Sequence, residues 1–227
     1  PGEEPLDLTL EQLRWIKRNP VARLVINDDM APGAYFDSSG VFSGGFADLL
    51  EVITLSTGLN FEVVLRRGGY PQMIETLKDN EADLALMTAS PEREAYLRFS
   101  RPLDASPFVL LSSKEQQGKL QNLADKRVAI PTGHVSSQQL RKRYPDAVII
   151  DAGTTLDTMN MLYKGKADAA IVALPAARYY MERLFRDKLV INQMLDVGPA
   201  TLNFAMRRSD VELQSIINKV CLLYTSD

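Results

Sequence analysis

The chain has 227 residues, with 26 lysines and arginines against 29 aspartates and glutamates, which gives a net charge of −3. This balance argues against a protein dedicated to nucleic acids, and a hydrophobic fraction of 45% excludes intrinsic disorder. No apolar run approaches the roughly 18 residues that a membrane-spanning helix needs.

Taken in chain order, the first half predicts helices and strands in alternation. Thr9 and Gln12 have the spacing of a capping box, so we expect a first helix that ends at Asn19-Pro20. Short apolar runs predict strands at residues 23–26, 61–65 and 84–87. Helical patterns lie at 46–57 and 70–78.

The same alternation resumes after residue 120. The expected strands lie at 127–130, 147–150 and 169–172. The expected helices lie at 135–143 and 155–163, near Pro175, and from 209 onward. Strands that alternate with helices of about three turns favour an α/β fold with a largely parallel sheet.

One pattern occurs twice. A leucine, four residues, Ala-Asp and an apolar strand follow one another at 77–87 and again at 162–172. In both cases a helix ends, the chain turns, and Asp83 or Asp168 leads into the strand. Two interpretations stay open: a common loop solution that arose twice, or two lobes of similar design.

A first candidate binding loop follows the strand at 84–87. Ligands gather beyond the carboxyl ends of strands in open α/β sheets. Arg93 offers a planar fork of donors to a carboxylate, and the hydroxyls of Thr88 and Ser90 lie nearby in the sequence. The alternative is that Arg93 pairs with a surface acid such as Glu92.

A second candidate loop follows the strand at 127–130 and opens a helix. Gly133 lets the backbone approach a ligand closely, and a helix N-terminus favours anions. His134 and Ser136 add polar side chains, although a polar loop or cap role is favoured for His134 over that of an acid or base.

Motifs for catalysis and cofactor binding are missing. The sequence has no phosphate-binding or dinucleotide-binding glycine motif, no serine-hydrolase elbow and no zinc-protease motif. The single cysteine and single histidine exclude a disulfide within the chain and a Cys/His zinc site. We therefore expect no cofactor, no metal and no catalytic centre.

These motifs as an ensemble resemble the family 3 bacterial extracellular solute-binding proteins. The resemblance covers roughly residues 20 to 219. It rests on Thr57-Gly-Leu59, Ala82-Asp83, Ser90-Pro-Glu-Arg93, Phe99-Ser-x-Pro102, Gly165-Lys-Ala-Asp168 and Phe204-Ala-Met-Arg. The opening Leu8-Thr-Leu-Glu-Gln-Leu-Arg-Trp15 is similar to the lead-in of the Venus-flytrap domains of BvgS/EvgS-type sensor histidine kinases.

The resemblance implies a two-lobed periplasmic-binding-protein type II (Venus flytrap) fold with two hinge crossovers. A lead-in helix would occupy residues 1–20. Lobe 1 would comprise 21–108 plus 203–219, and lobe 2 would comprise 109–202, with hinge strands at 109–111 and 200–202. The end of the sequence, residues 220–227, resembles translated adapter sequence and is expected to be non-native.

The family's ligand contacts carry over selectively. Arg93 stands where amino-acid binders hold the ligand α-carboxylate, and Gly133 stands in their anion loop. Their acid for the α-amine corresponds to Ala173, and their aromatic residue corresponds to Gly33, with Tyr35 close by. The resemblance therefore implies a small carboxylate-bearing solute without conventional recognition of an α-amino group.

The expected function is that of a periplasmic, non-enzymatic ligand-sensing domain of a membrane-anchored two-component histidine kinase. The expected partner is a small anionic solute rather than nucleic acid, and the parent is compatible with a homodimer. Two alternatives remain open: a free receptor of an ABC amino-acid-type importer, or a dehydratase-like enzyme on the same fold. The sequence downstream of residue 219 would separate a sensor from a free receptor.

Overall fold

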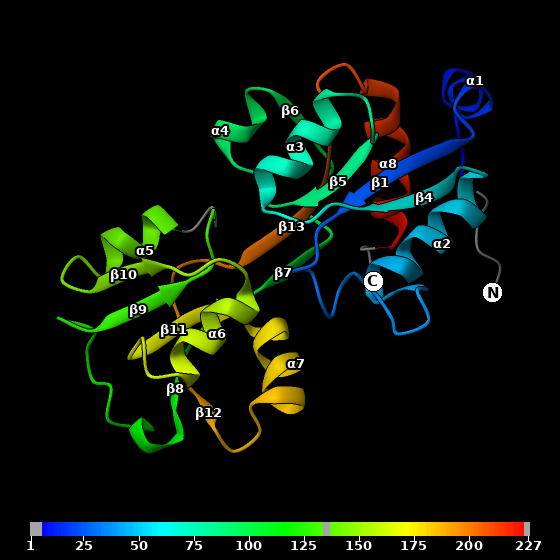
Figure 1. Ribbon diagram of the computed structural model, residues 1–227. Coiled ribbons are helices and arrows are strands. Elements are labelled where there is room, and N and C mark those ends of the chain that lie inside the picture. The colour runs from blue at the N-terminus through cyan, green and yellow to red at the C-terminus, as the bar shows by residue number, and fades with distance from the viewer. Residues whose placement is uncertain (1–5, 134–136, 225–227) are drawn as a thin grey trace. The chain divides into compact units, whose positions relative to one another are not determined.

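The computed structural model describes residues 6–133 and 137–224 (Figure 1). The chain divides into two compact units, each built around its own sheet. Unit 1 comprises Pro1–Asp104 and Thr201–Asp227, and unit 2 comprises Ala105–Ala200. The predicted two-lobed α/β fold is therefore present, and the chain passes from one unit to the other twice.

Unit 1 is built on a mixed sheet with the strand order β4-β1-β5-β13-β6. β1 runs parallel to β4 and β5, whereas β13 runs antiparallel to β5 and β6. The strands are β1 (Val21–Ile26), β4 (Asn60–Leu65), β5 (Leu84–Met87), β6 (Leu97–Phe99) and β13 (Ala200–Arg207). A short hairpin of β2 (Tyr35–Phe36) and β3 (Phe42–Ser43) lies outside this sheet.

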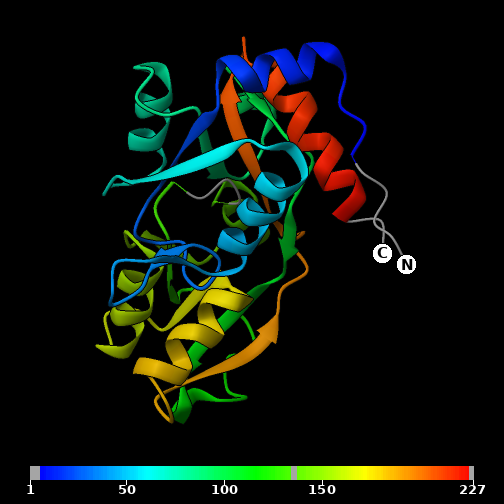
Figure 2. The same ribbon diagram turned by 90° about the vertical axis from the view of Figure 1, so that its right-hand side faces the viewer.

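The helices of unit 1 are α1 (Leu10–Arg18), α2 (Gly45–Thr57), α3 (Tyr70–Lys78), α4 (Pro91–Glu94) and α8 (Val211–Tyr224). The predicted capping box of α1 is confirmed, because Thr9 and Gln12 exchange side-chain and backbone hydrogen bonds. α1 lies beside α8 (Figure 2), and the amide of Gln12 donates to the hydroxyl of Ser215 on α8 at 3.0 Å.

The central strands β1 and β5 of unit 1 are covered on both faces. Leu24 and Ile26 of β1 pack in one cluster with apolar side chains of α2 and α8, while Val25 packs with Met73 of α3 on the opposite face. Successive side chains of a strand point to opposite faces, so a sheet covered on both sides requires a continuous apolar run. This requirement explains why β5 and the second half of β1 are unbroken apolar segments rather than alternating ones.

Unit 2 repeats this layered design with the strand order β10-β9-β11-β8-β12. Its strands are β8 (Phe108–Ser113), β9 (Arg127–Ile130), β10 (Val148–Asp151), β11 (Ala169–Ala173) and β12 (Leu189–Met194). Its helices are the one-turn η1 (Lys114–Gln116) and α5 (Ser137–Arg143), α6 (Thr155–Tyr163) and α7 (Leu174–Leu184). Val109 packs with the α6 and α7 side, and Leu110 packs with Leu140 of α5 on the other side.

The repeated Ala-Asp pattern forms the same clasp once in each unit. The carboxylate of Asp83 accepts bonds from the backbone N–H (2.8 Å) and side chain of Arg23, and Asp168 does the same with Arg127 (2.8 Å to the backbone N–H). Each arginine also donates to the carbonyl of the turn residue three positions before its aspartate. The two units therefore share this element of design.

The crossover out of unit 1 lies earlier than the predicted hinge strand at 109–111. Those residues lie within β8, a strand of the unit 2 sheet, and Leu111 is fully buried there. The chain leaves unit 1 at Asp104, within β7 (Asp104–Ser106), which pairs with β13. The apolar run at 108–111 serves the core of unit 2, so it is not available as a linker.

The C-terminal helix extends beyond the predicted native segment. α8 continues to Tyr224, and Val220 and Cys221 are buried in the unit 1 core. The non-native origin of residues 220–227 stays a prediction.

Candidate functional site

The first candidate loop is a compact local structure at the carboxyl end of β5. Thr88, Ala89 and Ser90 follow the strand, and the single-turn α4 begins at Pro91. The hydroxyl oxygen of Ser90 accepts a hydrogen bond from the backbone N–H of Arg93 at 3.1 Å. Serine before proline is a favoured helix start, because proline needs no N–H partner at the first position.

Arg93 is a buried cation within this loop. Only 9% of the residue is exposed. Its Nη1 donates to the carbonyl of Thr88 at 2.8 Å, and its guanidinium carbon lies 4.5 Å from the centre of the Tyr70 ring. The neighbouring Glu92 acts on this charge and favours its protonated form, so the alternative of a pairing with an acid stays open.

Burial also changes the electrostatics of this pair. Desolvation lowers the pKa of Arg93, because the charged form loses hydration, yet an arginine remains protonated at neutral pH. Burial raises the pKa of Tyr70, so its phenol stays neutral. A desolvated cation attracts an anion more strongly than an exposed one, because the surrounding medium screens it less.

Tyr70 is a contact that sequence reasoning missed. It is the first residue of α3 and follows Gly68-Gly69, whose small residues allow a sharp entry into the helix. The sequence placed it only at the start of a helix, 23 residues before its partner. The Gly-Gly-Tyr-Pro run could have pointed to Tyr70 as a site residue, because it puts an aromatic residue at a helix start next to a glycine turn.

Thr88 uses its hydroxyl hydrogen within unit 1. Its Oγ1 donates to the carbonyl of Thr201 at 2.6 Å, a residue 113 positions later in the chain. The Thr88 oxygen retains acceptor capacity, whereas its single donor is engaged. Thr88, Ser90 and Arg93 therefore lie together, but they differ in what they offer to a ligand.

Tyr35 and Gly33 belong to other segments of unit 1 than the Arg93 loop. Tyr35 opens β2 and pairs with Ser43 of the hairpin. A Cβ atom at Gly33 would lie 2.7 Å from Cε2 of Phe46, so the aromatic ring beside this position comes from α2 instead.

The predicted residues of unit 2 lie at the carboxyl ends of two adjacent parallel strands. Gly133 is exposed and has a φ of +75°, in the turn that follows β9. Ala173 is the last residue of β11 and immediately precedes α7. Its methyl group supplies no charge or hydrogen bond. His134 and Ser136 lie outside the described residues.

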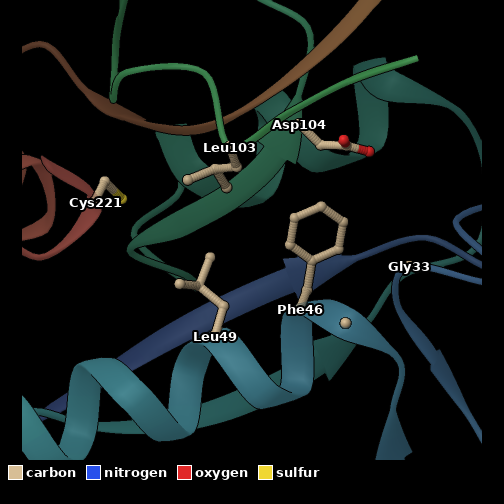
Figure 3. Close-up of a pocket in the computed structure, with 7 residues that line it drawn as sticks. Gly33, Phe46, Leu49, Leu103, Asp104 and Cys221 are labelled. Carbon is tan, nitrogen blue, oxygen red and sulfur yellow. The ribbon is translucent and has the colours of Figure 1, made fainter. Parts of the chain in front are cut away.

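A further cavity of about 250 Å³ is lined by residues of unit 1. None of its lining residues belongs to the loop at 88–93. In Figure 3, Phe46 and Leu49 of α2 face Leu103 and Asp104, with Cys221 at one side. Its lining is mostly apolar, and it shares only Gly33 with the positions that the resemblance singled out.

Across residues 6–133 and 137–224, no group of three or more His, Cys, Asp or Glu side chains is arranged to hold a metal ion. Within the same residues, no helix has both the length and the apolarity to cross a membrane.

Comparisons with known proteins agree on a single family. The family described as bacterial extracellular solute-binding proteins, family 3, matches residues 22–226. The virulence sensor protein BvgS of Bordetella pertussis is 30% identical over 217 residues, which cover 94% of this chain and 17% of BvgS. The sensor protein EvgS of Escherichia coli K12 is 26% identical over 216 residues, which cover 95% of this chain and 18% of EvgS.

A solved structure shows the same likeness. The periplasmic VFT2 domain of Bordetella pertussis BvgS matches with a TM-score of 0.90 and 30% identity, covering 97% of this chain and 94% of that domain. This chain spans less than a fifth of the two full-length sensors. The expected fold and periplasmic location are confirmed by these matches. The chain belongs to the bacterial extracellular solute-binding proteins, family 3.

Proposed function

We propose that this chain is the ligand-sensing domain of a periplasmic sensor and that it binds a small carboxylate-bearing solute through Arg93. One observation carries the proposal: Arg93 is a buried cation, oriented by the Thr88 carbonyl and the Tyr70 ring. A guanidinium is a planar fork of donors, and a fork held in a fixed orientation matches the two oxygens of a carboxylate.

The ligand class follows from what unit 2 offers. Ala173 stands at the position where relatives that bind amino acids have an acid, and its methyl group gives an ammonium no partner. We therefore propose a carboxylate without a recognised α-amino group. Binding would favour a closed arrangement of the two lobes, as a shift in population between pre-existing states.

The parent protein, in this proposal, is a membrane-anchored two-component histidine kinase. The sensor relatives support this assignment, and α8 would carry the signal toward the membrane. The alternative of a free receptor for an importer predicts that the gene ends soon after the α8 segment. Sequencing the gene downstream of residue 219 decides between the two.

The test is thermal unfolding in the presence of acetate, succinate, benzoate and the common amino acids. A ligand at about 100 times its Kd stabilises by about 2.7 kcal/mol, which is about 5–10 °C in Tm for a chain of this size. We expect a non-amino carboxylate to raise the Tm of the wild type, and this shift to vanish in Arg93→Ala.

Two control variants make the result specific. Arg93→Lys keeps the charge but loses the planar fork, so it should retain only part of the shift. Arg98→Ala removes an arginine of β6 that bonds Gln214 and the Arg208 carbonyl, and it should respond like the wild type. A shift produced only by amino acids would contradict the ligand class, and an unchanged shift in Arg93→Ala would contradict the site.

A further inference from the structure

Thr88 lies where the ladder between β5 and β13 ends. The last backbone pair of these two strands joins Met87 and Asn203. One step further, the hydroxyl of Thr88 donates to the Thr201 carbonyl at 2.6 Å. A side chain thus extends the ladder past its last backbone pair, toward the point where the chain enters unit 1.

Other bonds tie the same end of β13 to unit 1. The backbone N–H of Ala89 donates to Oδ1 of the buried Asn203 at 3.4 Å, and the Asn203 amide donates to the Ser100 carbonyl at 2.9 Å. The backbone N–H of Leu103 donates to the Leu202 carbonyl at 2.7 Å. Leu103 is the next-to-last residue before the chain leaves unit 1, and Leu202 is the second after its return.

Thr88 also contacts the proposed ligand residue. Its carbonyl accepts from Nη1 of Arg93 at 2.8 Å, while its hydroxyl donates to Thr201. One residue therefore joins the buried cation to the first residue of unit 1 after the crossover. The hydroxyl hydrogen that makes this link is not available to a ligand at the same time.

We propose that Thr88 is a positioning residue that couples Arg93 to the crossover, rather than a donor to the ligand. The coupling rests on the proposed function for its biological meaning, because it would carry the state of Arg93 to the segment that joins the units. The contacts themselves exist in unit 1 alone, so they can be tested without a ligand.

The experiment is amide hydrogen exchange of the ligand-free domain, read at Leu103 and Ala89. Thr88→Val keeps the shape of the side chain and removes the hydroxyl, and Thr88→Ser restores the hydroxyl. We expect exchange at these amides to rise about fivefold in Thr88→Val, as for the loss of one hydrogen bond, and to stay near wild type in Thr88→Ser.

Thr76→Val is the matched control. Thr76 is buried in α3, and its hydroxyl also donates to a carbonyl, that of Gln72 at 2.7 Å. This variant should leave Leu103 and Ala89 unchanged. If Thr76→Val accelerates them as much as Thr88→Val does, the effect is general destabilisation and the proposal fails. If Thr88→Val does not fold, Thr88→Ala takes its place.

A double-mutant cycle then tests the link to Arg93. Arg93→Ala should accelerate exchange at Leu103 in the wild-type background and have little further effect in Thr88→Val. Additive effects of the two substitutions would overturn the coupling. The carboxylate screen is independent of this result: a failed screen refutes the proposed ligand, whereas an additive cycle refutes only the role of Thr88.

Discussion

The clasp between Asp83 and Arg23 should contribute more stability than its counterpart in unit 2, and alanine substitution of each aspartate tests this. Asp83 accepts hydrogen bonds from the Arg23 backbone at 2.8 Å, from the Arg23 side chain, and from Nη2 of Arg207 at 2.9 Å. Its side chain is 19% exposed. Asp168 pairs with Arg127, and the side chains of Asp168 and Arg127 are 35% and 46% exposed.

The magnitude follows from what each substitution leaves behind. Removing one partner from a fully buried ion pair costs about 3–5 kcal/mol, whereas an exposed pair contributes about 0–1 kcal/mol. Arg23 is 35% exposed and Arg207 25% exposed, so solvent screening reduces the first figure. We expect Asp83→Ala to cost about 2–3 kcal/mol. Asp168→Ala should cost less than about half of that, because its ion pair is screened by solvent.

The assay uses a probe for each unit. The single tryptophan, Trp15, lies in α1 and reports on unit 1 during urea unfolding, while circular dichroism follows both units. Asp83→Ala should move the tryptophan transition to lower urea, whereas Asp168→Ala should leave it in place. An equal loss from both substitutions would refute the reasoning, because burial and Arg207 would then not matter.

The pH dependence provides a second test of the same clasp. Burial acts to raise the pKa of Asp83, but bonds from Arg23 and Arg207 outweigh it, and the pKa lies below its ordinary value. A carboxyl group with a lowered folded pKa contributes stability above its unfolded pKa of about 3.9 and loses it as the pH falls through the folded value. The free energy of unfolding should therefore differ most between wild type and Asp83→Asn at pH 7, and this difference should shrink below about pH 4.

Two further substitutions test local features of unit 1. Burial raises the pKa of Asp210 despite the neighbouring Arg207, so the charged carboxylate costs stability that is regained as the pH falls below its folded pKa. The Tm of Asp210→Asn relative to that of wild type should therefore be higher at pH 7 than at pH 3. An equal difference in Tm at the two pH values would contradict this. Gly44 has a φ of +103°, and an added Cβ would lie 2.3 Å from the Gly33 carbonyl oxygen. Gly44→Ala should lower the free energy of unfolding in urea by more than about 2 kcal/mol. Gly40 has a φ of +78° and open space around it, so Gly40→Ala should lower it by about 1 kcal/mol. Similar losses from the two substitutions would contradict the clash at Gly44.

Features that depend on neighbouring residues could be predicted from the sequence. The capping box of Thr9 and Gln12 and the end of α1 at Asn19 were predicted correctly, because all their atoms lie within a few residues. The apolar runs that form β1, β5, β9 and β11 were recognised for the same reason. The Thr88-to-Arg93 segment was also grouped correctly as one loop, because it follows β5 directly, although the helical turn that Ser90 caps was not predicted.

The tertiary structure decided what those local pieces contact. Tyr70 covers Arg93 although 23 residues separate them, and Thr88 bonds Thr201 across 113 residues. The position of the first crossover also depended on the fold, because the apolar run at 108–111 is equally compatible with a linker strand and with a core strand of unit 2. Local pattern specifies which residues form a strand or a cap, whereas the choice of partner depends on packing between segments distant in the sequence.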